Sequence, residues 1–209
     1  MPTRIGGFGG SEGLACHLLA QQVAVLVDAT HPFAARIGAN ARHAAEAAGV
    51  PLVTLRRPPW TRTENDRWTA AKDVAGAVAV LGDAPRRVFL TVGRQEAAAF
   101  DAAPQHAYLV RSVDPIEPPL TVPDVTYLLA RGPFGEADEL ALLERHRIDV
   151  IVAKNSGGDA TWGKIAAARR LGIEVVMIGR PHAHHGTTAT VDEAAAAVFR
   201  AVSGMDRGV

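Results

Sequence analysis

The chain has 209 residues, of which 48% are hydrophobic and only 5% aromatic, so its core must consist mainly of Ala, Val, Leu and Ile. Its 22 Lys and Arg residues balance its 22 Asp and Glu residues, which argues against a broad nucleic-acid surface or a polybasic membrane patch. A single cysteine, Cys16, excludes an intrachain disulfide and a CxxC zinc site. Because no segment has the character of a transmembrane span or a signal peptide, we expect a cytoplasmic protein.

Apolar runs of strand length alternate with Ala-rich runs of helical composition along most of the chain. The first half predicts strands at residues 23–27, 52–55, 88–92 and 108–110, and helices at residues 11–21, 34–48 and 73–81. The second half predicts strands at residues 126–130, 150–153 and 175–178, and helices at residues 136–145, 161–171 and 191–202. This alternation is typical of parallel sheets with right-handed crossovers, so the expected fold class is α/β.

Four prolines between residues 115 and 123 interrupt the alternation. Proline breaks helices and lacks the N–H group that a central strand needs. We therefore predict two Rossmann-like parallel-sheet domains that face a shared cleft. Residues 1–114 form the N-terminal domain, residues 115–123 the linker and residues 124–209 the C-terminal domain.

The most informative segment follows the predicted strand at residues 150–153. It is a polar turn that consists of Lys154, Asn155, Ser156, Gly157 and Gly158. A strand that leads through a glycine turn into a helix presents backbone N–H groups and the positive end of a dipole to a phosphate or carboxylate. Lys164 adds a cation nearby. An ordinary βαβ connection without a ligand is the alternative interpretation.

Ligands of parallel α/β sheets bind outside the carboxyl ends of the strands. Several predicted strands run into loops that contain basic residues, namely Arg56, Arg57, Arg94, Arg111, Arg131 and Lys154. Arginine is suited to bidentate capture of carboxylate or phosphate, so this pattern indicates a polyanionic ligand. The alternative is that roughly half of these residues are solvated surface groups.

Six motifs follow one another between Arg4 and Pro181: GGFGGSEGL, DATHPFAARIGANA, RPPW, LTVGRQE, RGPF and AKNSGGDATWGKIAAARRLGIEVVMIGRP. Together they resemble the precorrin-6A reductase family, which includes the cobalt-precorrin-6A reductases. The resemblance implies an oxidoreductase of cobalamin biosynthesis that acts on CH–CH bonds. Its substrate would be the precorrin-6A or cobalt-precorrin-6A macrocycle, reduced to precorrin-6B, and its cofactor would be NADPH.

Members of this family usually open with an apolar strand, a Gly-Gly-Thr type turn and a helix before the segment that matches Arg4 to Gly10. This sequence lacks that opening unit, so we expect an N-terminally truncated first domain. A start codon assigned too far downstream is the simpler explanation, and a truly short gene is the other. The alternative function for a short form is a non-catalytic tetrapyrrole-binding protein.

Roles for individual residues follow from the motifs. The candidate catalytic residues, which could supply a proton to the substrate, are Asp28, His31 and Lys154. The predicted substrate-binding residues are Arg94, Gln95 and Arg131. The predicted cofactor-binding residues are Thr30, Asn155, Ser156, Gly157, Gly158 and Lys164. For the loop that begins at Asp28, helix capping is an equally weighted alternative.

The expected partners are the macrocycle and neighbouring enzymes of the cobalamin pathway, without nucleic acid or membrane. His182, His184 and His185 form a cluster that could suggest a metal site. No carboxylate or cysteine stands at ligand spacing from this cluster before Asp192. A solvated loop is therefore the favoured interpretation, and no metal is predicted.

Overall fold

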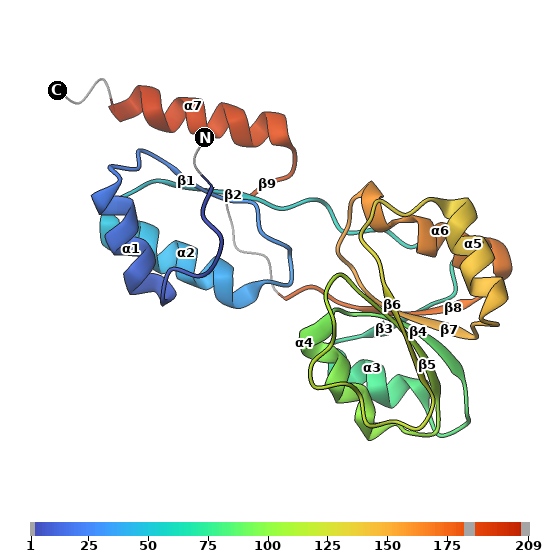
Figure 1. The fold of residues 1–209 in the computed structure, drawn as a ribbon. Helices are drawn as coiled ribbons and strands as arrows, with labels where there is room; N and C mark the ends of the chain where they lie inside the picture. The colour runs from blue at the N-terminus through green and yellow to red at the C-terminus, as the bar shows by residue number, and fades with distance from the viewer. Residues whose placement is uncertain (1–2, 182–186, 206–209) are drawn as a thin grey trace. The chain divides into compact units, whose positions relative to one another are not determined.

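The computed structural model describes residues 3–181 and 187–205, and Figure 1 shows the arrangement of their helices and strands. The chain divides into two units. Unit 1 consists of Met1–Pro58 and Pro181–Val209, and unit 2 consists of Pro59–Arg180. The chain therefore passes between the units twice.

Unit 2 contains a parallel sheet of six strands in the order β3-β8-β7-β4-β5-β6. The strands are β3 (Trp68–Ala71), β4 (Arg87–Thr91), β5 (Ala107–Ser112), β6 (Val125–Leu129), β7 (Val150–Lys154) and β8 (Glu174–Ile178). The helices are α3 (Val74–Leu81), α4 (Arg94–Ala97), α5 (Glu136–Arg145) and α6 (Gly163–Leu171), with short 3-10 helices at η1 (Ala98–Ala102) and η2 (Asp159–Thr161). Helices α3 and α4 lie on one face of the sheet, and α5 and α6 lie on the other (Figure 1).

The central strands of unit 2 are apolar on both sides because helices cover both faces of the sheet. In β7 all four residues from Val150 to Ala153 are buried, and in β4 so are Val88, Phe89 and Leu90. Ile165 of α6 packs into the same core, and α6 ends at Gly172 in the left-handed conformation that glycine favours. These strands and the end of α6 confirm the sequence prediction.

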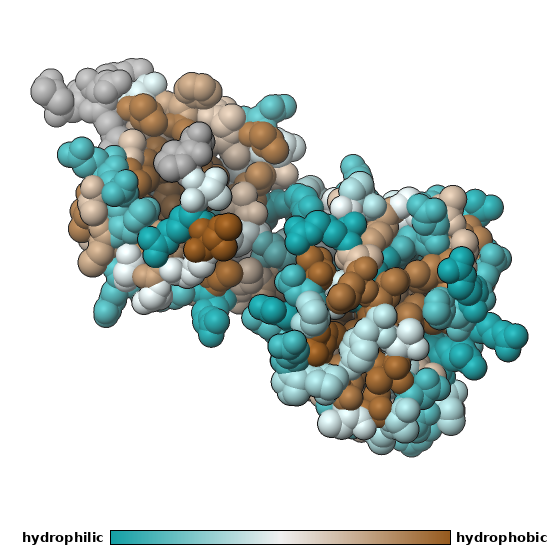
Figure 2. Space-filling view, viewed as in Figure 1, coloured by the Kyte–Doolittle hydropathy of each residue, from teal (hydrophilic) through white to brown (hydrophobic). Residues whose placement is uncertain are grey.

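Unit 1 contains a smaller parallel sheet in the order β1-β2-β9. Its strands are β1 (Leu26–Asp28), β2 (Leu52–Leu55) and β9 (Thr187–Thr188), and its helices are α1 (Gly10–Ala20), α2 (Ala35–Ala48) and α7 (Val191–Met205). Helices α1 and α2 lie on one side of this sheet and α7 on the other (Figure 1). Apolar side chains reach the surface of unit 1 (Figure 2), and the large exposed ones include Ile5, Leu19, Val27, Ile37, Val191, Phe199 and Val202.

The two parallel sheets confirm the predicted α/β class, but two strands were absent from the prediction. Strand β3, the first strand of unit 2, pairs with β8, the last strand of the same unit. Strand β9 follows β8 in sequence and yet pairs with β2 of unit 1. Unit 2 is thus one continuous segment, whereas unit 1 is completed by the returning C-terminal segment that carries β9 and α7.

The predicted domain boundary at residues 115–123 is wrong. This segment lies inside unit 2, where it joins the neighbouring strands β5 and β6. Its apolar residues Ile116, Leu120 and Val122 are buried, and the Leu120 N–H donates to the Tyr127 hydroxyl at 2.7 Å. Prolines do exclude regular structure here, but the segment packs onto its own unit instead of linking two. The predicted shared cleft stays a prediction.

Candidate functional site

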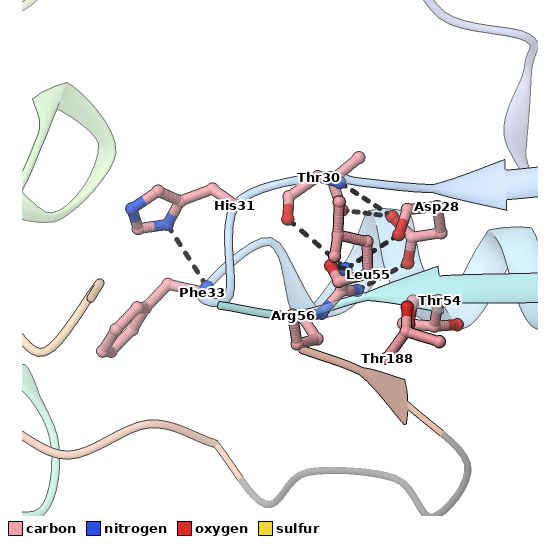
Figure 3. A network of polar contacts seen from close by, with 8 residues as sticks. All are labelled: Asp28, Thr30, His31, Phe33, Thr54, Leu55, Arg56 and Thr188. Carbon is pink, nitrogen blue, oxygen red and sulfur yellow. Dashed lines mark hydrogen bonds and ion pairs between the residues drawn. The ribbon is translucent and has the colours of Figure 1, made fainter. Parts of the chain in front are cut away.

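The carboxyl end of β1 carries a polar network that reaches the end of β2 (Figure 3). The Asp28 carboxylate accepts hydrogen bonds from the Thr30 backbone N–H at 3.0 Å and from the Thr30 hydroxyl at 2.6 Å. It also forms an ion pair with Arg56, whose Nη2 lies 2.5 Å from Oδ2. Arg56 Nη1 donates to the backbone carbonyls of Asp28 and Leu55 at 3.1 and 3.0 Å. Arg56 therefore fastens the loop after β1 to β2.

This network keeps Asp28 ionised. Burial of the carboxyl group favours the neutral form, but the hydrogen bonds from Arg56 and Thr30 outweigh burial and hold the pKa of Asp28 below its ordinary value of 3.8. An ionised carboxylate has no proton to give near neutral pH. The geometry therefore favours the capping and anchoring interpretation of Asp28 and Thr30 over the predicted catalytic role of Asp28.

His31 lies on the exposed side of the same loop. Its Nδ1 accepts a hydrogen bond from the Phe33 N–H at 3.3 Å, and the centroids of the two rings are 5.8 Å apart. Figure 3 shows the imidazole beyond the Asp28 network, on the side of the loop away from Arg56. His31 is therefore oriented by its neighbour but remains accessible to solvent, as a group that exchanges protons with a ligand must be.

A cavity of about 930 Å³ lies beside β1 in unit 1. Its walls include residues 6–10, parts of α1 and α2, and both Asp28 and Thr30. Gly9 and Gly10 adopt φ angles of 83° and 91°, which glycine tolerates far better than other residues. Ligand pockets in proteins commonly have volumes of this order. Asp28 and Thr30 thus border a space that could accommodate a ligand.

In unit 2, strands β4 and β7 are neighbours, and their carboxyl ends bring Lys154 beside Glu96. Lys154 Nζ donates to Glu96 Oε1 in an ion pair. The Lys154 side chain is 12% exposed and the Glu96 side chain 33%, so solvent reaches the pair mainly at the carboxylate. Glu96 is not among the predicted site residues, because its partner lies 58 positions away in the sequence.

The turn after β7 has the backbone shape that its glycines predict. Gly157 and Gly158 adopt φ angles of 65° and 76°. Within the described part of the chain, the backbone N–H groups of these two residues have no hydrogen-bond acceptor. Successive N–H groups in such a turn form a concave site for an anion. Ser156 beside them is buried, and its carbonyl accepts a hydrogen bond from Arg180 at 2.9 Å.

Two residues predicted to hold the cofactor have internal partners instead. The Asn155 side chain exchanges two hydrogen bonds with the backbone of Trp60, at 2.7 and 3.0 Å. Lys164 is 5% exposed, donates to the Thr161 carbonyl at 2.7 Å, and lies 5.1 Å from the centroid of the Trp60 ring. Burial lowers the pKa of Lys164 to about 7, and the nearby Arg111 acts in the same direction. Both side chains support the turn from inside the unit.

The three predicted substrate-binding residues lie exposed at the carboxyl end of the six-stranded sheet. Arg94 and Gln95 begin α4 directly after β4, and Arg131 follows β6. The side chains of Arg94 and Arg131 make no hydrogen bond or ion pair with the residues that the structure describes. Their guanidinium groups are therefore available to an anionic ligand, whereas the Lys154 ammonium already has a carboxylate partner.

Arg111, another cation at a strand end, is fully engaged inside unit 2. Its guanidinium makes two hydrogen bonds to the Glu139 carboxylate at 2.5 and 2.9 Å, and both side chains are buried. The guanidinium carbon also lies 3.7 Å from the ring centroid of Phe134 and 4.8 Å from that of Phe89. Arg111 and Arg56 are thus structural cations whose guanidinium groups are held by carboxylates of the same unit.

Across residues 3–181 and 187–205, no group of three or more His, Cys, Asp or Glu side chains could hold a metal ion. The cluster of His182, His184 and His185 lies outside the described residues. No helix in the portion of the chain that the structure describes is long and apolar enough to cross a membrane.

Comparison with known proteins identifies close relatives. The family described as "Precorrin-6x reductase CbiJ/CobK" matches residues 1–199. A protein from Sinorhizobium sp named "Precorrin-6A reductase" is 64% identical over 178 residues, which cover 85% of this chain and 68% of the relative. A protein of the same name from Rhodobacter capsulatus is 50% identical over 181 residues, which cover 87% of this chain and 72% of that relative. The solved structure of "CobK precorrin-6A reductase" matches with a TM-score of 0.92 and 46% identity, covering 96% of this chain and 80% of that structure.

Proposed function

Because the chain belongs to the precorrin-6x reductase family, we propose that it reduces the precorrin-6A macrocycle to precorrin-6B with NADPH. The substrate is the one named for the relatives that are 64% and 50% identical to this chain. A reduction of this kind adds a hydride to one carbon and a proton to its neighbour. The protein must therefore bind two anionic ligands together, exclude water and deliver the proton.

The observation that carries the proposal is a set of anion-binding groups at the carboxyl end of the six-stranded sheet. The Arg94 and Arg131 side chains are exposed and unpaired within the described chain. In the turn, the N–H groups of Gly157, which is buried, and Gly158, which is half-buried, have no acceptor among the described residues. Precorrin-6A is edged with carboxylates and NADPH carries phosphates, so both ligands require groups of this kind. Ligands of parallel α/β sheets bind at this end of the strands.

We assign the macrocycle carboxylates to Arg94, Gln95 and Arg131. The turn of Gly157 and Gly158 is the site that we assign to a cofactor phosphate, because backbone N–H groups suit a compact anion. NADPH, when bound, supplies the hydride. Asn155 and Lys164 serve this site indirectly, since their contacts with Trp60 and Thr161 hold the turn and the start of α6 in place.

Lys154 is the strongest candidate for the proton donor. It stands at the end of β7, where Glu96 holds its ammonium group and is itself in contact with solvent. A proton that leaves Lys154 can therefore be replaced from solvent through the Glu96 carboxylate. His31, which is exposed on the loop after β1, is the second candidate.

The direct test mixes the purified chain with NADPH and precorrin-6A and follows NADPH by its absorbance. NADPH should be oxidised only when the macrocycle is present, and the product should have the mass of precorrin-6B. Absence of oxidation by a chain that binds both ligands would overturn the proposal. Tight binding of the macrocycle without any binding of NADPH would instead support a tetrapyrrole-binding protein.

Replacing Arg94 with alanine should weaken macrocycle binding about tenfold, because a hydrogen bond between charged groups is lost. The loss should shrink as salt is added, since an exposed ionic contact is screened. Calorimetric titration at low and high salt measures both effects. Arg87→Ala is the matched control, because Arg87 is exposed at the opposite end of β4. Equal affinity of Arg94→Ala and the wild type at low salt contradicts the assignment.

A further inference from the structure

The chain crosses between the two units after Pro58 and again after Arg180. Trp60 is therefore one of the first residues of unit 2, and Arg180 is the last. These two residues are far apart in the sequence, but both are bonded to the turn that follows β7. The turn with the proposed anion site is thus also the place where the chain enters and leaves unit 2.

Three hydrogen bonds hold the incoming segment at Trp60. The Trp60 N–H donates to Asn155 Oδ1 at 2.7 Å, and Asn155 Nδ2 donates back to the Trp60 carbonyl at 3.0 Å. The indole Nε1 donates to the Gly158 carbonyl at 3.0 Å. The Trp60 ring also lies 5.6 Å from the ring of Trp162, at the start of α6. The Asn155 amide thus binds Trp60 as a neighbouring strand would, with one donor and one acceptor.

The outgoing segment is held at Arg180 by the backbone of the same turn. Arg180 Nε donates to the Asn155 carbonyl at 2.7 Å, and Nη2 donates to the Ser156 carbonyl at 2.9 Å. The Asn155 N–H donates to the Ile178 carbonyl at 3.0 Å, which continues the pairing of β7 with β8. Asn155 therefore contacts the incoming segment through its side chain and the outgoing segment through its backbone.

We propose that Asn155 is a positioning residue that ties both connections between the units to the ligand-binding turn. A ligand held by the N–H groups of Gly157 and Gly158 stabilises the turn. The stabilised turn then restrains Trp60 and Arg180 through their hydrogen bonds to it. Asn155 thereby acts on the proposed reaction without touching cofactor or substrate. The coupling to ligand rests on the proposed function, whereas the anchoring of the two connections does not.

The test compares amide hydrogen exchange in the full chain and in Asn155→Ala. Without ligand, exchange in residues 57–62 should be roughly tenfold faster in the variant, because two hydrogen bonds to Trp60 are lost. Exchange in the core strand β4 should stay as in the wild type. With NADPH added, exchange in residues 57–62 should slow in the wild type and much less in Asn155→Ala.

Two further variants make the result specific. Gln105→Ala removes another amide side chain that donates to a backbone carbonyl of unit 2, that of Gly82 at 2.9 Å, and should leave residues 57–62 unchanged. Trp60→Phe keeps an aromatic ring and both Asn155 bonds, but removes the indole bond to Gly158 and reduces the ring contact with Trp162. It should accelerate exchange in residues 57–62 by a smaller factor, roughly threefold. If Asn155→Ala does not fold, Trp60→Phe still tests whether the turn anchors the incoming segment: exchange in residues 57–62 equal to that of the wild type would contradict the anchoring.

Kinetics separate positioning from direct cofactor binding. A positioning role predicts that Asn155→Ala lowers kcat about tenfold while the KM for NADPH changes little, because the geometry of the site and not a cofactor contact is lost. Two results together would overturn the proposal. The KM for NADPH would rise about tenfold in Asn155→Ala, and ligand-free exchange in residues 57–62 would equal that of the wild type. If the wild-type chain does not oxidise NADPH with the macrocycle, the proposed function is wrong. The ligand-free exchange result would still test the anchoring of the two connections.

Discussion

Replacing Glu139 with alanine is expected to lower the free energy of unfolding by about 3–5 kcal/mol, because it leaves the buried Arg111 guanidinium without its carboxylate. Glu139 is 2% exposed and Arg111 7%, so water cannot replace the lost partner. Lys164 is buried close by, and the Glu139 charge favours its protonated form. Removing Glu139 therefore takes a stabilising negative charge away from two buried basic groups.

Urea unfolding of Glu139→Ala beside the wild type measures this loss. Glu136→Ala is the matched control, because Glu136 lies on the same helix and pairs with Arg170 at 3.4 Å. This pair is exposed, since 43% of the Glu136 side chain and 67% of the Arg170 side chain are accessible to solvent. An exposed pair of this kind contributes under about 1 kcal/mol. Comparable losses in the two variants would contradict the buried role of Arg111. The double variant Arg111→Met with Glu139→Leu should recover much of the stability.

Replacing Lys164 with methionine is expected to change how stability depends on pH. Burial lowers the pKa of Lys164 to about 7 from an ordinary value of 10.5. Between these values the unfolded chain binds a proton at Lys164 that the folded chain does not, so wild-type stability should rise with pH by up to about 1.4 kcal/mol per unit. Below pH 7 both states are protonated, and the folded protein bears the full cost of the buried charge. Lys164→Met should remove the cost of the buried charge, so the free energy of unfolding should rise less steeply with pH than in the wild type.

Urea unfolding at several pH values between 7 and 10 tests this prediction. Lys72→Met, at an exposed lysine, is the control and should keep the wild-type pH profile. A Lys164→Met profile that rises as steeply as the wild type would show that Lys164 is charged in the folded protein. NADPH affinity of the same variant distinguishes the two roles of Lys164, since a direct phosphate contact predicts a loss that an internal support does not.

The sequence by itself determined the fold class, the central strands and the family. Strands such as β7 are uninterrupted apolar runs, and a residue pattern of this kind depends only on near neighbours in the chain. The turn at Gly157 and Gly158 could also be predicted from the sequence, because glycine adopts positive φ angles with far less strain than other residues. Arg94 and Arg131 could be proposed as ligand contacts because they directly follow predicted strands.

Only the tertiary structure decided which charged groups remain available to a ligand. Arg56 pairs with Asp28 and Arg111 with Glu139, each across 28 positions, and Lys154 pairs with Glu96 across 58. No local pattern in the sequence indicates these partners, because Glu139 on α5 and Glu96 on α4 meet their cations only when helices pack on the sheet. The same reason explains the misplaced domain boundary. The return of β9 to unit 1 depends on pairing across the whole chain, and a strand of two residues is too short to be recognised in the sequence.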